Sequence, residues 1–193
     1  KDYATRPLQA IGRMATSTLA ILGGVGGIGA MVWTTRLADD LETARIGFET
    51  MLKSAEETTK FIAQIQQFAK ETPFGQREVV ELAKNLLVRG FGQNEIIPML
   101  ERIGNVAAAM GTGEEGIDRI IYALGQMRAL GRVSAQDMNQ LTDAGVRAWD
   151  YMAKGRGKSI AEVRKMSEKG LITADVAIKH ILEGMKEFDG MMQ

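Results

Sequence analysis

Several residue types on which enzymes and small secreted proteins depend are scarce in this sequence. It contains no cysteine, which excludes a disulfide framework and thiolate chemistry. It contains a single histidine, His180, which excludes a metal site built from several imidazoles. Aromatic residues make up 6% of the chain, whereas methionine occurs 12 times. Because methionine is flexible and fills irregular gaps, this composition is typical of helices with adaptable apolar faces.

The chain also lacks an excess of charge of either sign. Its 24 lysine and arginine residues balance 24 aspartate and glutamate residues. This balance argues against a dedicated nucleic-acid binder, which needs a basic excess for phosphate contacts, although it allows a local basic patch. The 193 residues suffice for one sizeable core, or for a core with an appendage. The start at Lys1 rather than Met indicates a fragment or a processed product.

No charged residue interrupts the run from Met14 to Trp33. Its length matches the roughly 20 residues that span a bilayer, and Gly23 and Gly27 have the spacing of close membrane helices. Each glycine, however, costs about 1 kcal/mol of helix propensity outside a membrane, so a flexible or locally buried linker remains an alternative. No Ala-x-Ala-like site ends the run, which disfavours a signal peptide. We predict that residues 1–34 form an apolar Gly-rich segment, membrane-competent or packed between copies.

The same run contains a G-x-G-x-x-G match at Gly24–Gly29, with the acidic residue Glu49 about 20 residues further on. A dinucleotide site would need a second parallel strand that ends near this acid. The apolar residues of 37–52 recur with helical spacing instead, and Glu49 lies inside that pattern. We therefore expect no nucleotide cofactor.

Residues 35–193 have the apolar pattern of helices almost throughout, as in the stripe from Val79 through Leu82 and Ala83 to Leu86. No convincing strand occurs in this region. Short loops make consecutive helices neighbours, and each narrow stripe must be buried against another helix. The sequence predicts an all-α fold, a compact array of short amphipathic helices with Gly-capped turns.

The segment from Leu130 to Asp137 ends one helix and begins the next. Gly131 can take the left-handed conformation that closes a helix, and Ser134 can cap the next helix with Asp137 as its capping-box partner. A near copy follows at 169–176, with Gly170 and Thr173 in the corresponding positions.

Further helix starts are expected from the same rules. Ser54 and Glu57 form a capping box, Thr72 and Pro73 provide an N-cap and a first helical residue, and Asn94 and Ser159 cap two more helices.

Few residues suggest chemistry. The paired acids Asp39–Asp40, Glu56–Glu57 and Glu114–Glu115 fall at expected helix starts, where negative charge favours the helix dipole. His180 lies at the border of an apolar face without an evident serine or acid partner. Trp149 and Tyr151 fit a packing anchor better than a ligand platform. We therefore predict no catalytic, cofactor-binding or metal-ligating residue, and no enzyme.

A modest basic cluster lies within residues 147–169. It is either a solvated face or a contact for nucleic acid or an acidic partner. A helix-turn-helix reader would place residues 135–143 in the DNA groove, but this segment holds two acids and no base. The cluster consists of Arg147, Lys154, Arg156, Lys158, Arg164, Lys165 and Lys169.

Taken in order, the segments over roughly residues 35–190 resemble the tape measure domain of tailed bacteriophage and prophage tail proteins. No single motif is specific, and the ordered set carries the resemblance. One departure is Val146–Trp149, where the pattern usually has proline soon after the glycine. The matching segments are Gly47–Leu52, Ala69–Phe74, Ala83–Gly90, Ile103–Ala108 with Gly111, Ala123–Ser134, Gln140–Gly145, Lys165–Met166 and Lys169–Ile172.

The resemblance implies a structural role for residues 35–193 as a helical tape measure domain. Such proteins are long helical chains in the tail lumen of the virion, and their length sets tail length. The implied partners are other copies, tail tube proteins, tail-tip or baseplate proteins and, in the bacterial cytoplasm, assembly chaperones. Release at genome ejection would bring Met14–Trp33 to the host envelope. No small-molecule substrate is implied.

Two readings from other classes remain open. One is a helical scaffold or regulatory module that binds protein or nucleic acid through residues 147–169. The other is a lytic enzyme, for which we find no motif.

Overall fold

The computed structural model describes residues 41–192. The chain divides into two compact units, residues 1–46 and 47–193, and the description below concerns the second. Residues 41–52 are helical. The Met14–Trp33 run, the G-x-G-x-x-G match and the Asp39–Asp40 pair lie outside the described residues, so those predictions stay predictions.

Helices make up the described part of the chain, and no strand occurs between residues 41 and 192. The prediction of an all-α fold is therefore confirmed. After the helix of residues 41–52 the elements are α3 (Ala55–Glu71), α4 (Gln76–Val88), α5 (Gln93–Met110), α6 (Gly113–Leu130), α7 (Ala135–Asp143), α8 (Ala148–Arg156), α9 (Ile160–Glu168), α10 (Ala174–Gly184) and the 3₁₀ helix η1 (Met185–Phe188).

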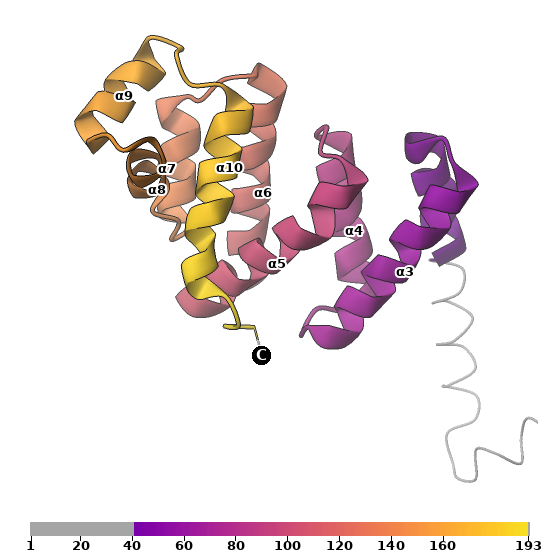
Figure 1. Cartoon of the computed structure of the whole chain (residues 1–193). Coiled ribbons are helices and arrows are strands. Elements are labelled where there is room, and N and C mark those ends of the chain that lie inside the picture. The colour runs from indigo at the N-terminus through magenta and orange to yellow at the C-terminus, as the bar shows by residue number, and fades with distance from the viewer. Residues whose placement is uncertain (1–40, 193) are drawn as a thin grey trace, which may run out of the picture. The chain divides into compact units, whose positions relative to one another are not determined.

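Consecutive helices from α3 to α9 pack side by side, as the short loops predict, and three contacts between helices further apart in the sequence close the array. Helix α10 packs against both α6 and α8, and η1 returns the chain to α5. Figure 1 shows α3 at one end of this unit and α9 at the other. The core is formed by aliphatic, methionine and phenylalanine side chains from all of these helices, including Phe61, Ile65, Leu86, Ile103, Leu124 and Met152.

The two near-copy turns have the predicted backbone, since Gly131 and Gly170 have φ values of 68° and 66°. They also pair with each other, which the sequence did not predict. The Val133 amide donates to the Ile172 carbonyl at 3.3 Å, and the Ala174 amide donates to the Gly131 carbonyl at 3.1 Å. This isolated bridge ties the start of α7 to the start of α10.

The predicted capping box at Ser134 is present, and the predicted cap Ser159 also forms a capping box. In each, the serine hydroxyl accepts from the amide three residues on and the acid side chain accepts from the serine amide, in Ser134–Asp137 and Ser159–Glu162. Ser54 also caps its helix by accepting from the Glu57 amide at 3.2 Å. The reciprocal bond is missing there, because the Glu57 carboxylate accepts from Lys60 and from Gln93.

Two predicted helix starts are wrong. Helix α4 begins at Gln76 with Gly75 as its N-cap, because Thr72 ends α3 in an extended conformation and its hydroxyl donates back to the Phe68 carbonyl. Helix α5 begins before Asn94, because the Glu95 carboxylate accepts from the Gly92 amide at 2.7 Å and makes Gly92 the N-cap.

Thr173 occupies the predicted N-cap position of α10 but makes no side-chain capping bond. Among the helices of residues 41–192, none has both the length and the apolarity needed to cross a membrane.

Candidate interaction surfaces

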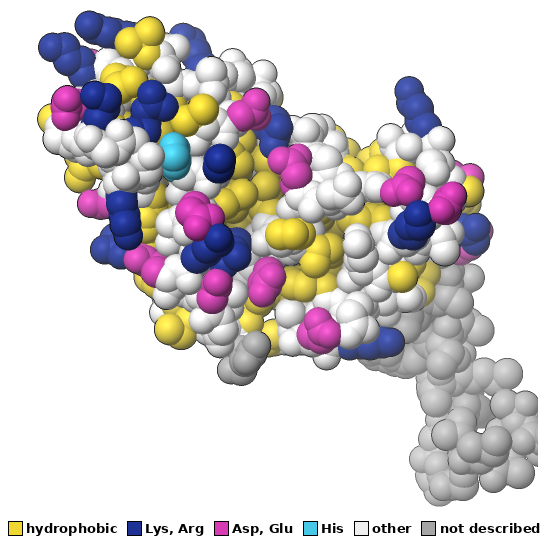
Figure 2. All heavy atoms as spheres, in the orientation of Figure 1, with side chains coloured by type: hydrophobic (Ala, Val, Ile, Leu, Met, Phe, Trp, Pro, Cys, Tyr) yellow, Lys and Arg dark blue, Asp and Glu magenta, His cyan; other side chains and the backbone are white. Residues whose placement is uncertain are grey.

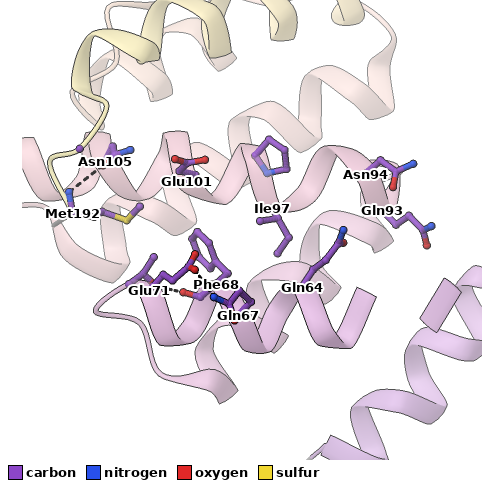
Figure 3. Close-up of a pocket in the computed structure, with 13 residues that line it drawn as sticks. Gln64, Gln67, Phe68, Glu71, Gln93, Asn94, Ile97, Glu101, Asn105 and Met192 are labelled. Carbon is purple, nitrogen blue, oxygen red and sulfur yellow. Dashed lines mark hydrogen bonds between the residues drawn. The ribbon is translucent and has the colours of Figure 1, made fainter. Parts of the chain in front are cut away.

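A groove of about 450 Å³ lies between α3 and α5, and Met192, near the C-terminus, lies at one end of it (Figure 3). The apolar side chains among its lining residues are Phe68, Ile97, Pro98 and Met192. Figure 3 shows the α3 side chains Gln64, Gln67 and Glu71 along one side, and Gln93, Asn94 and Glu101 along the other.

Local packing holds Phe68 and the C-terminal tail in place along this α3–α5 groove. Phe68 is buried and stacks on Phe74 with ring centroids 6.2 Å apart. The side-chain oxygen of Asn105 accepts from the Met192 amide at 3.0 Å, and Arg102 pairs with Asp189, which together anchor the C-terminal tail on α5. A side chain at Gly104 would collide with Met192 and Phe74, so this helical glycine makes room for both.

The lining of the groove is acidic and amide-rich. Its 13 residues include the carboxylates Glu71 and Glu101 and contain no lysine or arginine. Both carboxylates are exposed. Such a surface favours an occupant that offers apolar side chains flanked by positive charge.

A second cleft, of about 710 Å³, lies between α8, α10 and η1. The Arg147 guanidinium donates to both carboxylate oxygens of Glu187, at 2.7 and 2.6 Å, and the Tyr151 hydroxyl donates to the same carboxylate. Burial and the bond to Glu187 raise the pKa of Tyr151 to about 12. The bonds from Arg147 and Tyr151 lower the pKa of Glu187.

The single histidine lines this second cleft as a packing residue. His180 is half-buried, and its ring lies where a side chain at Gly155 would otherwise be. Burial lowers its pKa, and the nearby charges of Arg156 and Lys179 act in the same direction. The ring is therefore neutral at neutral pH. In the same way, the Tyr151 ring lies where a side chain at Gly184 would otherwise be. Gly155 and Gly184, which no sequence pattern singled out, therefore allow α8 and α10 to pack closely against each other.

The predicted basic cluster lies at the α9 end of the unit. Residues 147–169 hold seven basic and three acidic residues, a net charge of +4 in a chain whose total is zero. Figure 2 shows dark blue side chains gathered over this end. Arg147 pairs with Glu187 in the second cleft, so we do not count it in the basic surface. The other six residues, Lys154, Arg156, Lys158, Arg164, Lys165 and Lys169, form what we call the α8–α9 basic surface.

Aromatic side chains support this surface from below. Trp149 and Tyr151 are 7% and 5% exposed, which confirms the predicted packing anchor. The Arg164 guanidinium lies 5.0 Å from the Trp149 ring, a cation–π contact that holds the arginine against α8.

Helix α7, the candidate DNA-recognition helix, packs against other helices of the same chain. Helix α7 buries Met138 and Leu141 and contacts α6, α8 and α9. Its Asp137 caps the helix start.

The paired acids Glu56–Glu57 and Glu114–Glu115 lie in the first turns of α3 and α6, which confirms them as helix-start residues. Within residues 41–192, no three histidine or acidic side chains gather so as to hold a metal ion.

These features define an all-helical structural module. Residues 34–193 match the family model described as tape measure protein, and the chain belongs to that family of structural phage tail proteins. The family expected from the ordered segments is thereby confirmed.

Curated relatives come from Lactococcus phages. The chain is 26% identical over 146 residues to the probable tape measure proteins of phages p2 and SK1, covering 74% of this chain and 14% of each relative. It is 25% identical over 146 residues to the tape measure protein of phage F4-1, of which it covers 38%. The chain thus spans well under half the length of these relatives. No solved structure matches the chain.

Proposed function

We propose that this chain is a folded, fixed-point module of a phage tail tape measure protein, distinct from the segments whose extended length sets tail length. The family match supplies the tail context. The folding of the chain supports the fixed-point role. Helices α5 and α6 have 18 residues each, so each extends only about 27 Å before the chain turns back. Residues 55–184 in one unbroken helix would extend about 195 Å.

A ruler segment needs a constant rise per residue, which this module lacks. The breaks at Gly111, Gly131, Gly145 and Gly157, all with positive φ, return the chain on itself. Within the whole protein the module serves as an attachment point for the tail tube or for tail-tip or baseplate proteins. Assembly chaperones hold the protein before it enters the tail. Genome ejection releases it, and Met14–Trp33 then contacts the host membrane.

Two deletions in the phage that encodes this chain test the proposal. Removing helical turns from a long flank of the tape measure protein should shorten tails in proportion. Removing residues 36–193 should abolish assembly or infectivity. Electron micrographs of the particles measure both outcomes. Infectious particles shortened by the full extended-helix length of the module would show that the module is only a ruler segment.

A second candidate is a helical scaffold or regulator that binds nucleic acid through the α8–α9 basic surface. The local net charge of +4 favours it, and the balanced total charge opposes it. Binding to duplex DNA that weakens with salt and is lost in an Arg164→Glu, Lys165→Glu variant would support this role. Absence of binding at low salt would remove it.

A further inference from the structure

We infer that the α3–α5 groove receives a short extended segment of a different protein, which places a lysine or arginine between Glu71 and Glu101 and apolar side chains beside it. The inference rests on the proposed attachment role and deepens it, because it names the surface and the chemistry of the partner. The shape, the charge and the hydrogen-bonding groups of the groove support it.

The groove runs along both helices. Its lining positions recur at intervals of three and four residues, from Gln64 to Glu71 on α3 and from Asn94 to Asn105 on α5. At 1.5 Å per residue these stretches extend about 10 and about 16 Å, the length of roughly three to five residues of extended chain. A volume of about 450 Å³ holds a few side chains rather than a whole helix, which is about 10–12 Å wide. The shape therefore fits a short extended segment.

The two carboxylates of the groove lack a cation. Figure 3 shows Glu71 and Glu101 in the same half of the groove, on its two sides. Glu71 accepts a hydrogen bond from Gln67, and neither carboxylate has an ion pair within residues 41–192. Arg102, which follows Glu101 in the sequence, pairs with Asp189 instead. This half of the groove therefore favours a cation that the partner supplies.

The remaining polar groups match a peptide backbone. Five of the 13 lining residues are glutamine or asparagine, whose amides both donate and accept hydrogen bonds. Asn105 is 2% exposed, and its side-chain oxygen accepts from the Met192 amide. Its side-chain nitrogen has no partner in the described part of the chain, so a backbone carbonyl of the occupant would supply the missing acceptor. A free polyamine offers no acceptor, and the phosphates of nucleic acid would be repelled by the carboxylates.

A random decapeptide library tests the inference. Selection on the immobilised full chain should enrich sequences that combine lysine or arginine with apolar residues. Synthetic peptides of these sequences should bind the wild-type chain with salt-sensitive affinity, measured by fluorescence anisotropy. The groove variant, Glu71→Lys with Glu101→Lys, should bind them at least about tenfold more weakly, because like charges then face each other. The matched control, Glu81→Lys with Glu114→Lys, changes two exposed acids outside the groove and should bind like the wild type.

Exchanging the charges gives the decisive result. Peptides in which glutamate replaces the basic residue should lose affinity for the wild-type chain and gain it for the groove variant, and circular dichroism confirms that each variant is folded. Selection of no sequence or of sequences without a basic residue, unchanged affinity in the groove variant, or an exchanged peptide that still prefers the wild type would each overturn the inference. So would displacement by spermidine at a concentration comparable with that of the peptide, which would identify a free polyamine as the occupant.

The attachment role is tested separately in the phage. If deletion of residues 36–193 abolishes assembly while a phage with Glu71→Lys and Glu101→Lys assembles normally, the attachment role stands and the inference about the groove falls. If the deletion only shortens the tail, the attachment role falls and the inference falls with it.

Discussion

At the scale of single residues, the clearest demands come from the two glycines that end α6 and α9. Gly131 and Gly170 both have positive φ, and nothing lies within 4 Å of the position of an added Cβ. Glycine is therefore favoured at these positions because of the backbone conformation, and not because a larger side chain would collide with a neighbour. A β-branched residue in the left-handed region is strained.

We expect Gly131→Val and Gly170→Val each to lower the free energy of unfolding by about 1 kcal/mol or more. Denaturant unfolding followed by circular dichroism measures the change. Gly47→Ala is the control, because Gly47 is helical, its φ is ordinary and its added Cβ meets open space. That variant should be unchanged or more stable by up to about 1 kcal/mol. Unchanged midpoints in both valine variants would contradict the role of the turns.

The hydrogen-bonded set of Arg147, Tyr151 and Glu187 makes stability depend on pH. The folded-state pKa of Tyr151, about 12, lies above the ordinary tyrosine value of 10.0, so the fold opposes ionisation of this phenol. This stabilisation is complete below about pH 10 and is lost as the pH rises toward about 12. The pKa of Glu187 is shifted downward, so its contribution to stability is present above the ordinary glutamate value of 4.5 and is lost as the pH falls below it.

An ultraviolet titration of the phenolate band tests the alkaline part. We expect one tyrosine of the folded wild-type chain to ionise near pH 12, and Tyr151→Phe should remove that step. The free energy of unfolding of the variant should also fall less steeply between about pH 10 and about pH 12. If the titration of the variant differs from the wild type by a step near pH 10, Tyr151 is not protected by the fold.

At the scale of elements, the starts of α7 and α10 offer a matched comparison. The sequence treats Ser134 and Thr173 as equivalent caps. In the structure the Ser134 hydroxyl accepts from the Asp137 amide at 3.1 Å, whereas Thr173 makes no side-chain capping bond and is exposed. Ser134→Ala should therefore cost about 1 kcal/mol of stability, and Thr173→Ala only a few tenths. Thermal unfolding of the two variants measures both, and equal losses would mean that the capping bond contributes nothing.

The sequence predicts helices well where the physics is local. The stripe of α4 and the caps at Ser134 and Ser159 follow from periodicity and from partners three residues away. The starts of α4 and α5 were misplaced because competing local bonds decided them. The Thr72 hydroxyl donates to the Phe68 carbonyl at the end of α3, and the Glu95 carboxylate accepts from the Gly92 amide, which makes Gly92 rather than Asn94 the N-cap of α5.

Longer-range features had no signal in the sequence. The pairing of the two glycine turns joins residues about 40 positions apart, and the α3–α5 groove is closed by the bond between Asn105 and Met192, 87 positions apart. The basic cluster was visible as composition. Its placement over Trp149, on a projecting α9, depends on how α8 and α9 pack.

At the scale of the whole molecule, residues 47–193 hold their own core. The buried apolar side chains run from Phe48, whose ring meets Phe61 at 5.2 Å, to Met185. The C-terminal tail then returns to α5 through the Arg102–Asp189 pair, which closes the array. A unit with a continuous core of this kind should unfold in one cooperative step.

Deleting residues 1–34 should therefore leave a folded domain with an unchanged unfolding midpoint. We propose that the deleted segment is membrane-active or self-associating, because a charge-free run such as Met14–Trp33 has little reason to stay exposed to water. The truncated chain should then lose liposome binding and associate more weakly. Liposome flotation and sedimentation velocity on both chains measure these effects. If the full chain is monomeric and ignores liposomes, the run is only a linker, and a lowered midpoint after deletion would show that the core of residues 47–193 depends on it.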